Sequence, residues 1–145
     1  MTQILVVDDE LAIREVLIEF LSEHGYEAEG AEDGQEALEM AKRLKPQVIL
    51  LDIAMPGMNG IETLKRLRQA SIGAAVIMIS GHADQDQALM ALDLGAFDFI
   101  QKPLDFRYLE RTLLAKIVTL EPHDEGRTSK EADGERRRNT GQRNR

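Results

Sequence analysis

The sequence predicts an α/β fold built on a parallel, doubly wound sheet. Short apolar runs alternate with helical patterns five times along the chain. Four of the five runs are almost wholly apolar, as strands are when helices cover both faces of their sheet. Strands that alternate with helices pair in parallel and connect through right-handed crossovers. The pattern therefore indicates five strand–helix units in one sheet.

The apolar runs are the five expected strands. They span Ile4–Val7, Tyr26–Gly30, Val48–Leu51, Val76–Ile79 and Phe97–Ile100. The second run, Tyr-Glu-Ala-Glu-Gly, alternates polar and apolar residues, whereas the others do not. Alternation is typical of a strand with one solvated face, so we expect this run at an edge of the sheet.

Apolar stripes identify the first and last of the helices between these strands. Residues at i, i+3, i+4, i+7 and i+8 spacing share one helix face. In the first helix they are Ile13, Val16, Leu17, Phe20 and Leu21. In the last helix they are Phe106, Leu109, Leu113 and Ile117. Each stripe is expected to pack against the sheet.

Polar residues mark where the other helices begin. Two pairs have the spacing of a capping box, Asp33 with Glu36 and Asn59 with Glu62. Single aspartates, Asp84 and Asp105, precede the fourth and fifth helices. A side-chain oxygen at this position accepts a hydrogen bond from a free N–H of the first turn. The sequence thus predicts side-chain caps on the last four helices.

Composition separates a domain, residues 1–120, from a tail, residues 121–145. The tail carries seven basic and six acidic side chains and has no large apolar residue, so it cannot build a core. Since the chain has a net charge of −8, residues 1–120 carry −9, which disfavours general nucleic-acid binding. There is no cysteine, no long apolar run and no basic N-terminal flank. We expect a cytoplasmic domain with a disordered tail and without membrane contact.

Polar side chains follow four of the expected strands at the point where each strand ends. They are Asp8, Asp9 and Glu10 after the first, Asp52 after the third, Ser80, Gly81 and His82 after the fourth, and Lys102 and Pro103 after the fifth. The carboxyl ends of parallel strands meet at one edge of the sheet, where ligands bind. Three carboxylates, a hydroxyl and an ammonium group are therefore expected to converge there.

These residue types suit phosphoryl transfer assisted by a metal ion. Clustered carboxylates repel one another unless a hard cation such as Mg²⁺ joins them. A carboxylate can attack phosphorus, and cationic groups and donors then stabilise the transferred group. Gly81 would let the backbone approach closely. Each residue also has an ordinary alternative: Asp8 and Asp9 as helix-start acids, Asp52 as a turn residue, Ser80 as a turn hydroxyl, and Lys102 as a surface charge.

Four segments resemble the receiver domain of bacterial two-component response regulators. They are ILVVDDE, VILLDIAMPGMNGIE, VIMISGHAD and FDFIQKP, within residues 3–120. The resemblance implies a flavodoxin-like sheet of order 2-1-3-4-5 wrapped by five helices. It also implies a chemotaxis-regulator-like switch protein rather than a turnover enzyme.

The resemblance implies a role for each site residue. Asp52 would accept a phosphoryl group from a sensor histidine kinase or a phosphotransfer protein. Mg²⁺, with Mn²⁺ as a substitute, would bind Asp9, Asp52 and the carbonyl of Ala54, and Asp8 through water. Lys102 would pair with Asp52 and the phosphoryl group, and the Lys102–Pro103 bond would be cis.

The switch positions depart from the commonest family pattern. Ser80 stands where threonine is usual, and Phe99 stands where tyrosine is usual; Phe99 could equally be a core residue. Ala54 and His82 would flank the water that removes the phosphoryl group, although His82 could also be a plain turn residue. The His82→Ala variant is then expected to change the dephosphorylation rate.

Three functions stay open at this stage. The chain could be a stand-alone receiver, or the receiver part of a transcription factor without its effector domain. A phosphatase with an aspartate nucleophile is disfavoured because Ala54 stands where a second aspartate is needed. The output would be a target protein or a second copy of the chain bound through residues 84–120. The arginine-rich tail could touch nucleic acid, but a solvated tail is favoured.

Overall fold

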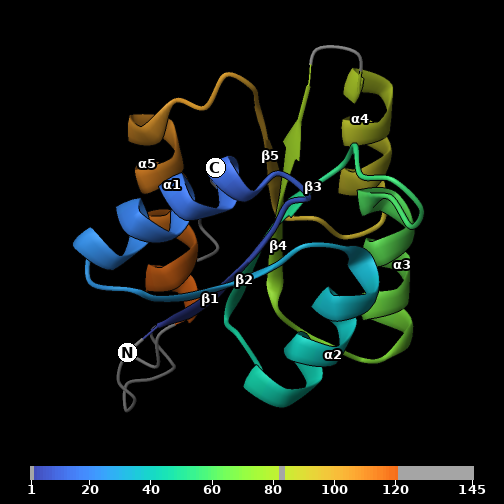
Figure 1. Ribbon diagram of the computed structural model, residues 1–145, viewed down its shortest axis with the longest axis horizontal. Coiled ribbons are helices and arrows are strands. Elements are labelled where there is room, and N and C mark those ends of the chain that lie inside the picture. The colour runs from blue at the N-terminus through green and yellow to red at the C-terminus, as the bar shows by residue number, and fades with distance from the viewer. Residues whose placement is uncertain (1, 82–83, 121–145) are drawn as a thin grey trace, which may run out of the picture. The chain divides into compact units, whose positions relative to one another are not determined.

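A computed structural model describes residues 2–81 and 84–120, and its strands match the apolar runs of the sequence (Figure 1). The strands are β1 (Gln3–Val7), β2 (Glu27–Ala31), β3 (Val48–Asp52), β4 (Ala75–Ser80) and β5 (Asp98–Gln101). Every strand begins and ends within one residue of the predicted run. The positions of the apolar runs were therefore sufficient to place the strands.

In the described parts of the chain, four helices connect the strands and a fifth follows β5. They are α1 (Leu11–Glu23), α2 (Gly34–Leu44), α3 (Gly60–Gln69), α4 (Gln85–Asp93) and α5 (Phe106–Leu120). By its internal contacts the chain divides into Met1–Leu113 and Leu114–Arg145. The predicted tail, residues 121–145, lies outside the described residues.

The strands form one parallel sheet of order β2-β1-β3-β4-β5, which confirms the flavodoxin-like order. β2 is an edge strand, as its alternating pattern predicts, and its Glu27 and Glu29 are exposed. Charged side chains on an edge strand discourage pairing with another sheet. β3 and β4 lie inside the sheet, and all of their residues are buried.

Helices cover both faces of this sheet (Figure 1). α1 and the part of α5 up to Leu113 lie on one face, whereas α2, α3 and α4 lie on the other. In the core beneath α2, α3 and α4, alternate residues of the strands pack against the inner faces of these helices. Its members include Leu5, Ile49, Leu51, Val76, Met78, Ala37, Leu38, Leu64, Leu67, Ala88 and Ala91. Burial of this apolar surface fixes the strand ends that carry the polar residues.

Three of the four predicted side-chain caps are present. The Asp33 side chain accepts from Glu36 N at 2.8 Å, and Asn59 Oδ1 accepts from Glu62 N at 2.9 Å. The returning half of a capping box is absent from both: the Glu36 carboxylate accepts from Glu32 N, and Glu62 pairs with Arg66. Asp105 Oδ1 accepts from the N–H groups of Arg107 and Tyr108.

The fourth predicted cap is wrong. Asp84 stands at the N-cap position of α4, but its side chain makes no capping hydrogen bond. Its Oδ2 instead accepts from the N–H of Gly81 at 3.0 Å. The backbone of Asp84 has φ of −106° and ψ of 16°, whereas a residue that caps with its side chain has an extended backbone, as Asp33 and Asn59 do.

The predicted stripe of α1 is only partly buried. Leu17 and Leu21 are fully buried, whereas Val16 is 50% exposed. Val16 lies about 100° around the helix from Leu17, and therefore falls beside the face that meets the sheet. The rings of Phe20 and of Phe106 in α5 are in contact at a tilt of 44°, with their centroids 4.8 Å apart. The helix thus buries a narrower stripe than its spacing predicts.

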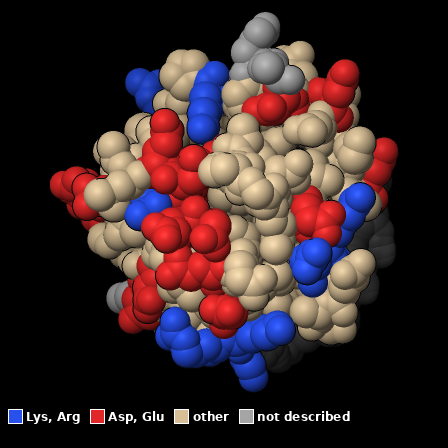
Figure 2. All heavy atoms as spheres, turned by 45° about the vertical axis from the view of Figure 1, so that its right-hand side comes forward, with Lys and Arg blue, Asp and Glu red and all other residues tan. Residues whose placement is uncertain are grey.

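Acidic side chains are clustered on the surface of the domain. Acidic side chains gather in a band on the face shown in Figure 2, with several basic side chains toward the margins of that view. Within residues 2–81 and 84–120, no helix combines the length and the apolar character needed to cross a bilayer.

Candidate functional site

Four strand ends deliver polar side chains to one edge of the sheet. Asp8 follows β1, Asp52 ends β3, Ser80 ends β4, and Lys102 follows β5. Register places Asp52 opposite Ile79, one residue before Ser80. The parallel sheet therefore brings these residues together as the sequence predicts.

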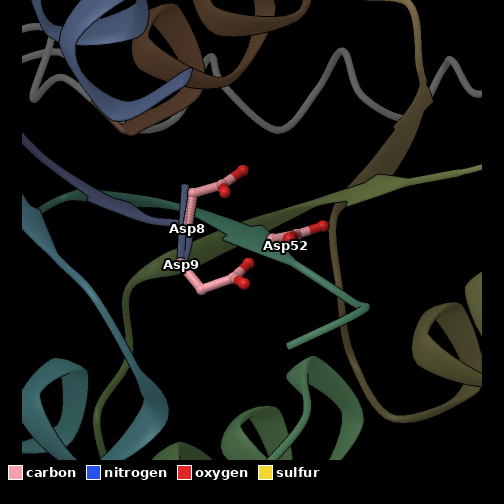
Figure 3. A group of neighbouring side chains, drawn as sticks. All are labelled: Asp8, Asp9 and Asp52. Atoms are coloured by element: carbon pink, nitrogen blue, oxygen red, sulfur yellow. The ribbon is translucent and has the colours of Figure 1, made fainter. Parts of the chain in front are cut away.

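Three carboxylates form the centre of the site (Figure 3). One oxygen from each of Asp8, Asp9 and Asp52 lies within 4.8 Å of the others. Asp8 and Asp52 are 1% and 2% exposed, whereas Asp9 is exposed. Two carboxylates are thus shielded from water while the third faces it, a donor set that suits a hard divalent cation.

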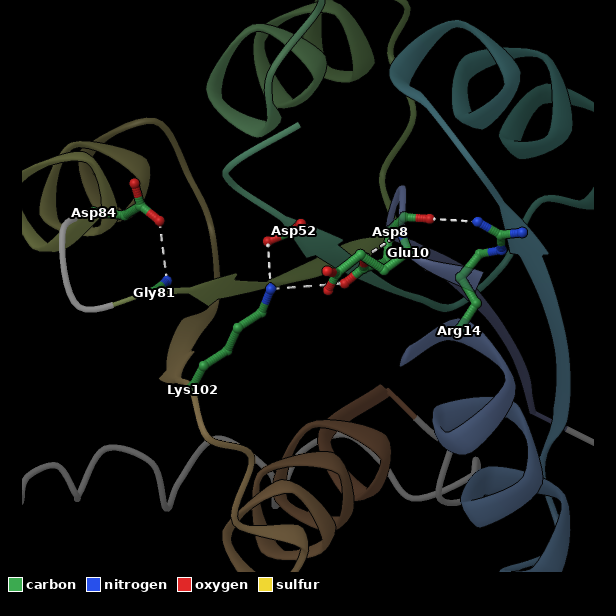
Figure 4. A network of polar contacts seen from close by, with 7 residues as sticks. All are labelled: Asp8, Glu10, Arg14, Asp52, Gly81, Asp84 and Lys102. Carbon is green, nitrogen blue, oxygen red and sulfur yellow. Dashed lines mark hydrogen bonds and ion pairs between the residues drawn. The ribbon is translucent and has the colours of Figure 1, made fainter. Parts of the chain in front are cut away.

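Lys102 is the cation that faces the two buried carboxylates (Figure 4). Its Nζ lies 3.4 Å from Asp52 Oδ1 and 4.0 Å from Asp8 Oδ2. Both separations exceed the 2.7–2.9 Å typical of a charge-assisted hydrogen bond. Lys102 therefore offsets part of the negative charge without binding either carboxylate closely.

The buried acids show the electrostatic cost of this arrangement. Burial, and then the charge of Asp8, raise the pKa of Asp52 to about 6 although Lys102 lowers it. Burial also raises the pKa of Asp8. Burial opposes the charge of Lys102, but the carboxylates of Asp52 and Asp8 outweigh it and raise its pKa. The site holds more negative charge than its single lysine can neutralise.

Three buried oxygens at this edge make no hydrogen bond of good geometry. They are Asp8 Oδ2, Asp52 Oδ1 and Ser80 Oγ, the members of that class among the described residues. Buried polar groups are nearly always paired, so each orphan needs an explanation. A cation would satisfy the carboxylate oxygens, and a phosphoryl oxygen would satisfy the hydroxyl. The residues present therefore fit both groups.

The loop between β3 and α3 also contacts Asp52 and fixes the end of its strand. The N–H of Ala54 donates to the Asp52 carboxylate, and Gly60 N donates to Ile53 O at 2.8 Å. A Cβ on Gly60 would overlap the Asp52 carbonyl oxygen and lie 2.7 Å from Ile53 Cα. Gly57 adopts φ of +72°, which a residue with a side chain rarely adopts. Glycines thus let the start of α3 press against the end of β3.

The two predicted switch residues share one face of the sheet. Phe99 pairs in register with Met78, and Ser80 is two residues beyond Met78. Ser80 is fully buried, and Phe99 is partly buried against the core under α2, α3 and α4. The Lys102–Pro103 peptide bond is cis, as predicted. His82 lies outside the described residues.

Glu10 lies at this edge as predicted, whereas Arg14 and the contact of Asp84 were not predicted. Glu10 N donates to Asp8 Oδ1 at 2.9 Å, and Arg14 Nη1 donates to the Asp8 carbonyl at 2.8 Å. Asp84 binds Gly81 N–H beside the site, as Figure 4 shows. Arg14 could have been found from helix phase, since it stands one turn after Glu10. The contact of Asp84 could not be predicted from the sequence, because an aspartate before a helix gives the same pattern whichever backbone donor its side chain binds.

Comparison with known proteins places this geometry in a family. Residues 4–114 match the family described as the response regulator receiver domain. The chain is 35% identical over 122 residues to the "Response regulator MprA" of Mycobacterium leprae (strain TN), which covers 84% of this chain and 54% of that protein. It is 42% identical over 128 residues to a "Protein-glutamate methylesterase/protein-glutamine glutaminase" of Bacillus licheniformis, covering 82% and 36%. The chain spans about half the length, or less, of these curated relatives.

Solved structures of receiver domains are similar to this fold. A response regulator receiver domain protein from Clostridium thermocellum superposes with a TM-score of 0.78 at 29% identity, covering 82% of this chain and 96% of that one. The chemotaxis protein CheY4 of Vibrio cholerae gives a TM-score of 0.74 at 32% identity, covering 79% and 98%. With the acidic cluster, the lysine and the strand order all in place, the chain belongs to the response regulator receiver domain family.

Proposed function

We propose that Asp52 accepts a phosphoryl group from a sensor histidine kinase or a phosphotransfer protein, and that this modification switches the binding of a partner. The carrying observation is the buried, hydrogen-bond-deficient Asp52 oxygen between two further aspartates and Lys102. Receiver domains act in phosphoacceptor signalling, and the chain belongs to that family. The exchange would take place in the cytoplasm.

The proposed transfer is a displacement at phosphorus. A carboxylate oxygen of Asp52 attacks the phosphorus of a phosphohistidine, the phosphorus–nitrogen bond breaks, and the imidazole nitrogen leaves with the electron pair. Lys102 Nζ, 3.4 Å from Asp52 Oδ1, supplies positive charge beside the transferred group. The unpaired hydroxyl of Ser80 supplies a donor. The chain would thus act on itself and would not turn over a separate substrate.

Mg²⁺, with Mn²⁺ as a substitute, fits the same oxygens. We assign Asp9, Asp52 and the carbonyl of Ala54 as direct ligands, and Asp8 as a ligand through water. The separation of at most 4.8 Å between the carboxylate oxygens supports a shared ion. When bound, the ion supplies charge that offsets the carboxylates and the incoming phosphoryl group.

The proposed output depends on Ser80 and Phe99. Ser80 Oγ would turn toward the phosphoryl group, and Phe99 would fill the space that the hydroxyl leaves. Residues 84–120 would then bind a target protein or a second copy of the chain. Ala54 and His82 would set how fast water removes the phosphoryl group. The acidic surface supports a protein partner over nucleic acid.

A second candidate is that this chain is the receiver part of a longer transcriptional regulator. The partial coverage of a response regulator, 54% of its length, favours this possibility. In that case residues 1–120 would be the receiver and residues 121–145 a disordered linker toward an effector. A phosphatase remains disfavoured, since Ala54 has no side-chain carboxylate to serve as a general acid.

The first prediction concerns labelling. With Mg²⁺ and acetyl phosphate, the wild type is expected to gain one phosphoryl group, seen by intact-mass spectrometry, because Asp52 is the poised nucleophile. The Asp52→Asn variant is expected to gain none. Glu19→Gln, which changes an exposed carboxylate of α1, is the matched control and should label like the wild type. Equal labelling of Asp52→Asn would refute Asp52 as the acceptor.

The second prediction concerns the metal. Added Mg²⁺ is expected to stabilise the folded chain, by about 2.7 kcal/mol at a free concentration of 100 times Kd, because the ion binds only the assembled carboxylates. The measurement is urea unfolding at fixed ionic strength, with K⁺ replacing Mg²⁺ in the control. Asp9→Asn should lose most of the gain, and Glu19→Gln should retain it. A gain that is the same in Asp9→Asn would mean that Mg²⁺ acts elsewhere.

A further inference from the structure

The backbone N–H of Gly81 is the first donor beyond the end of β4 on the side of Asp52. Along a strand, successive residues direct their N–H and C=O groups to opposite neighbours. Ser80 O accepts from Lys102 N of the β5 side, whereas Ile79 O accepts from Ile53 N of the β3 side. Gly81, two residues beyond Ile79, therefore directs its N–H toward β3, the strand that ends in Asp52.

No backbone carbonyl of β3 is available for this N–H. In a continued ladder its acceptor would be Ile53 O. That oxygen already accepts from Gly60 N at 2.8 Å and from Met55 N at 3.1 Å, because the chain turns into the loop before α3. Gly81 N–H is thus a donor at the phosphoryl edge of the sheet that needs a partner from outside the ladder.

The carboxylate of Asp84 fills this role. Asp84 Oδ2 accepts from Gly81 N at 3.0 Å (Figure 4). Although Asp84 is the N-cap residue of α4, it gives no side-chain cap to that helix. Its own N–H donates to Gly81 O at 3.1 Å, so Gly81 and Asp84 are joined by two hydrogen bonds. The side chain therefore links the start of α4 to the backbone donor next to Asp52.

We propose that Asp84 is a positioning residue that competes with the phosphoryl group for the Gly81 N–H. The proposal rests on Asp52 as the phosphoacceptor. A phosphoryl group on Asp52 brings acceptor oxygens and negative charge to the side that Gly81 N–H faces. It would take over this donor and repel the Asp84 carboxylate, which then no longer links α4 to Gly81. The contact holds the unphosphorylated arrangement, and its loss transmits phosphorylation to the start of α4.

The other end of α4 is anchored, which confines such a change to its N-terminal turn. Arg68 of α3 donates from Nη2 to the carbonyl of Gly95, just beyond the end of α4, at 3.1 Å. Its Nη1 also donates to Ile72 O and Ala74 O. A guanidinium held by three carbonyls is a fixed point, so release of Asp84 would act on one end of the helix.

Affinity for beryllofluoride, a phosphoryl mimic, tests the competition. With Mg²⁺ present, Asp84→Ala is expected to bind it about fivefold more tightly than the wild type, the net worth of one hydrogen bond. Asp84→Asn keeps an acceptor but loses the charge, so about a twofold gain is expected. The matched control is Asp86→Asn, which removes a first-turn acid of α4 that has no part in the contact. It should bind like the wild type.

Each result decides one question. Wild-type affinity in both Asp84 variants would overturn the competition, and so would an equal gain in Asp86→Asn, since charge alone would then explain it. If Asp84→Ala loses its helical circular dichroism, the affinities of Asp84→Asn and Asp86→Asn for beryllofluoride are compared instead, and equal affinities would overturn the competition. If the wild type binds beryllofluoride no better than Asp52→Asn does, the phosphoacceptor function itself fails, and not the role of Asp84.

Discussion

Asp52→Asn is expected to make the metal-free protein more stable at pH 7, by about 2–3 kcal/mol. Asp52 is 2% exposed, and burial together with Asp8 raises its pKa from 3.8 to about 6. Each pKa unit corresponds to about 1.4 kcal/mol, so an ionised Asp52 opposes folding by that amount. An amide of the same shape carries no charge and removes the repulsion. The proposed phosphoryl acceptor thus weakens the fold that contains it.

The sign of this effect fixes its pH window. Between pH 3.8 and about 6 the folded state holds a proton on Asp52 that the unfolded state has lost. The free energy of unfolding therefore falls as the pH rises through this range and stays low above it. The raised pKa of Asp8 acts in the same direction. In Asp52→Asn the fall should be smaller, with the part due to Asp8 remaining.

Urea unfolding in the presence of a chelator, at about pH 4 and pH 7, measures the difference. Glu19→Gln removes an exposed carboxylate and should change stability by less than about 0.5 kcal/mol at either pH. A gain in Asp52→Asn that is equal at both pH values would show that the amide packs better, and would contradict an electrostatic origin. No gain at pH 7 would mean that Lys102 already compensates both buried acids.

The strands and the edge that carries the site were predictable because burial and spacing determine them. An apolar run such as Val48–Leu51 can be covered on both faces only inside a sheet, and its parallel neighbours then end at the same edge. Asp8, Asp52, Ser80 and Lys102 could be assigned to that edge from their place after each run. Their convergence follows from topology and needs no knowledge of side-chain contacts.

The contacts of Asp84 and Val16 were not predictable in this way. An aspartate before a helix satisfies the same pattern whether it bonds its own helix or a neighbouring strand end, and only the three-dimensional position of Gly81 decides. Val16 lies at the margin of an apolar stripe, and its 50% exposure depends on how α1 meets its neighbours. Sequence periodicity identifies which face is apolar but not how far a neighbour extends over it.

The close approach of α3 to β3 could not be predicted from the sequence either. The Gly60→Ala variant tests it and is expected to lose at least about 3 kcal/mol in the free energy of unfolding, the upper end for overpacking. A methyl group at position 60 would meet the backbone of Asp52 and Ile53, with Ile53 Cα 2.7 Å away. The backbone at the end of β3, where Ile53 N is bonded to Ile79 O, cannot move aside as a flexible side chain can. The start of α3 must therefore shift, and the Gly60 N to Ile53 O hydrogen bond must lengthen or break.

Gly73→Ala is the matched control, since a Cβ there would meet nothing within 4 Å. Its unfolding midpoint in urea should stay close to that of the wild type, which separates the clash at Gly60 from the general effect of replacing a glycine. Equal, small losses in the two variants would contradict a steric requirement at position 60. A large loss in Gly60→Ala alone, with slower labelling of Asp52 by acetyl phosphate, would mean that the same close contact supports both the fold and the position of the acceptor.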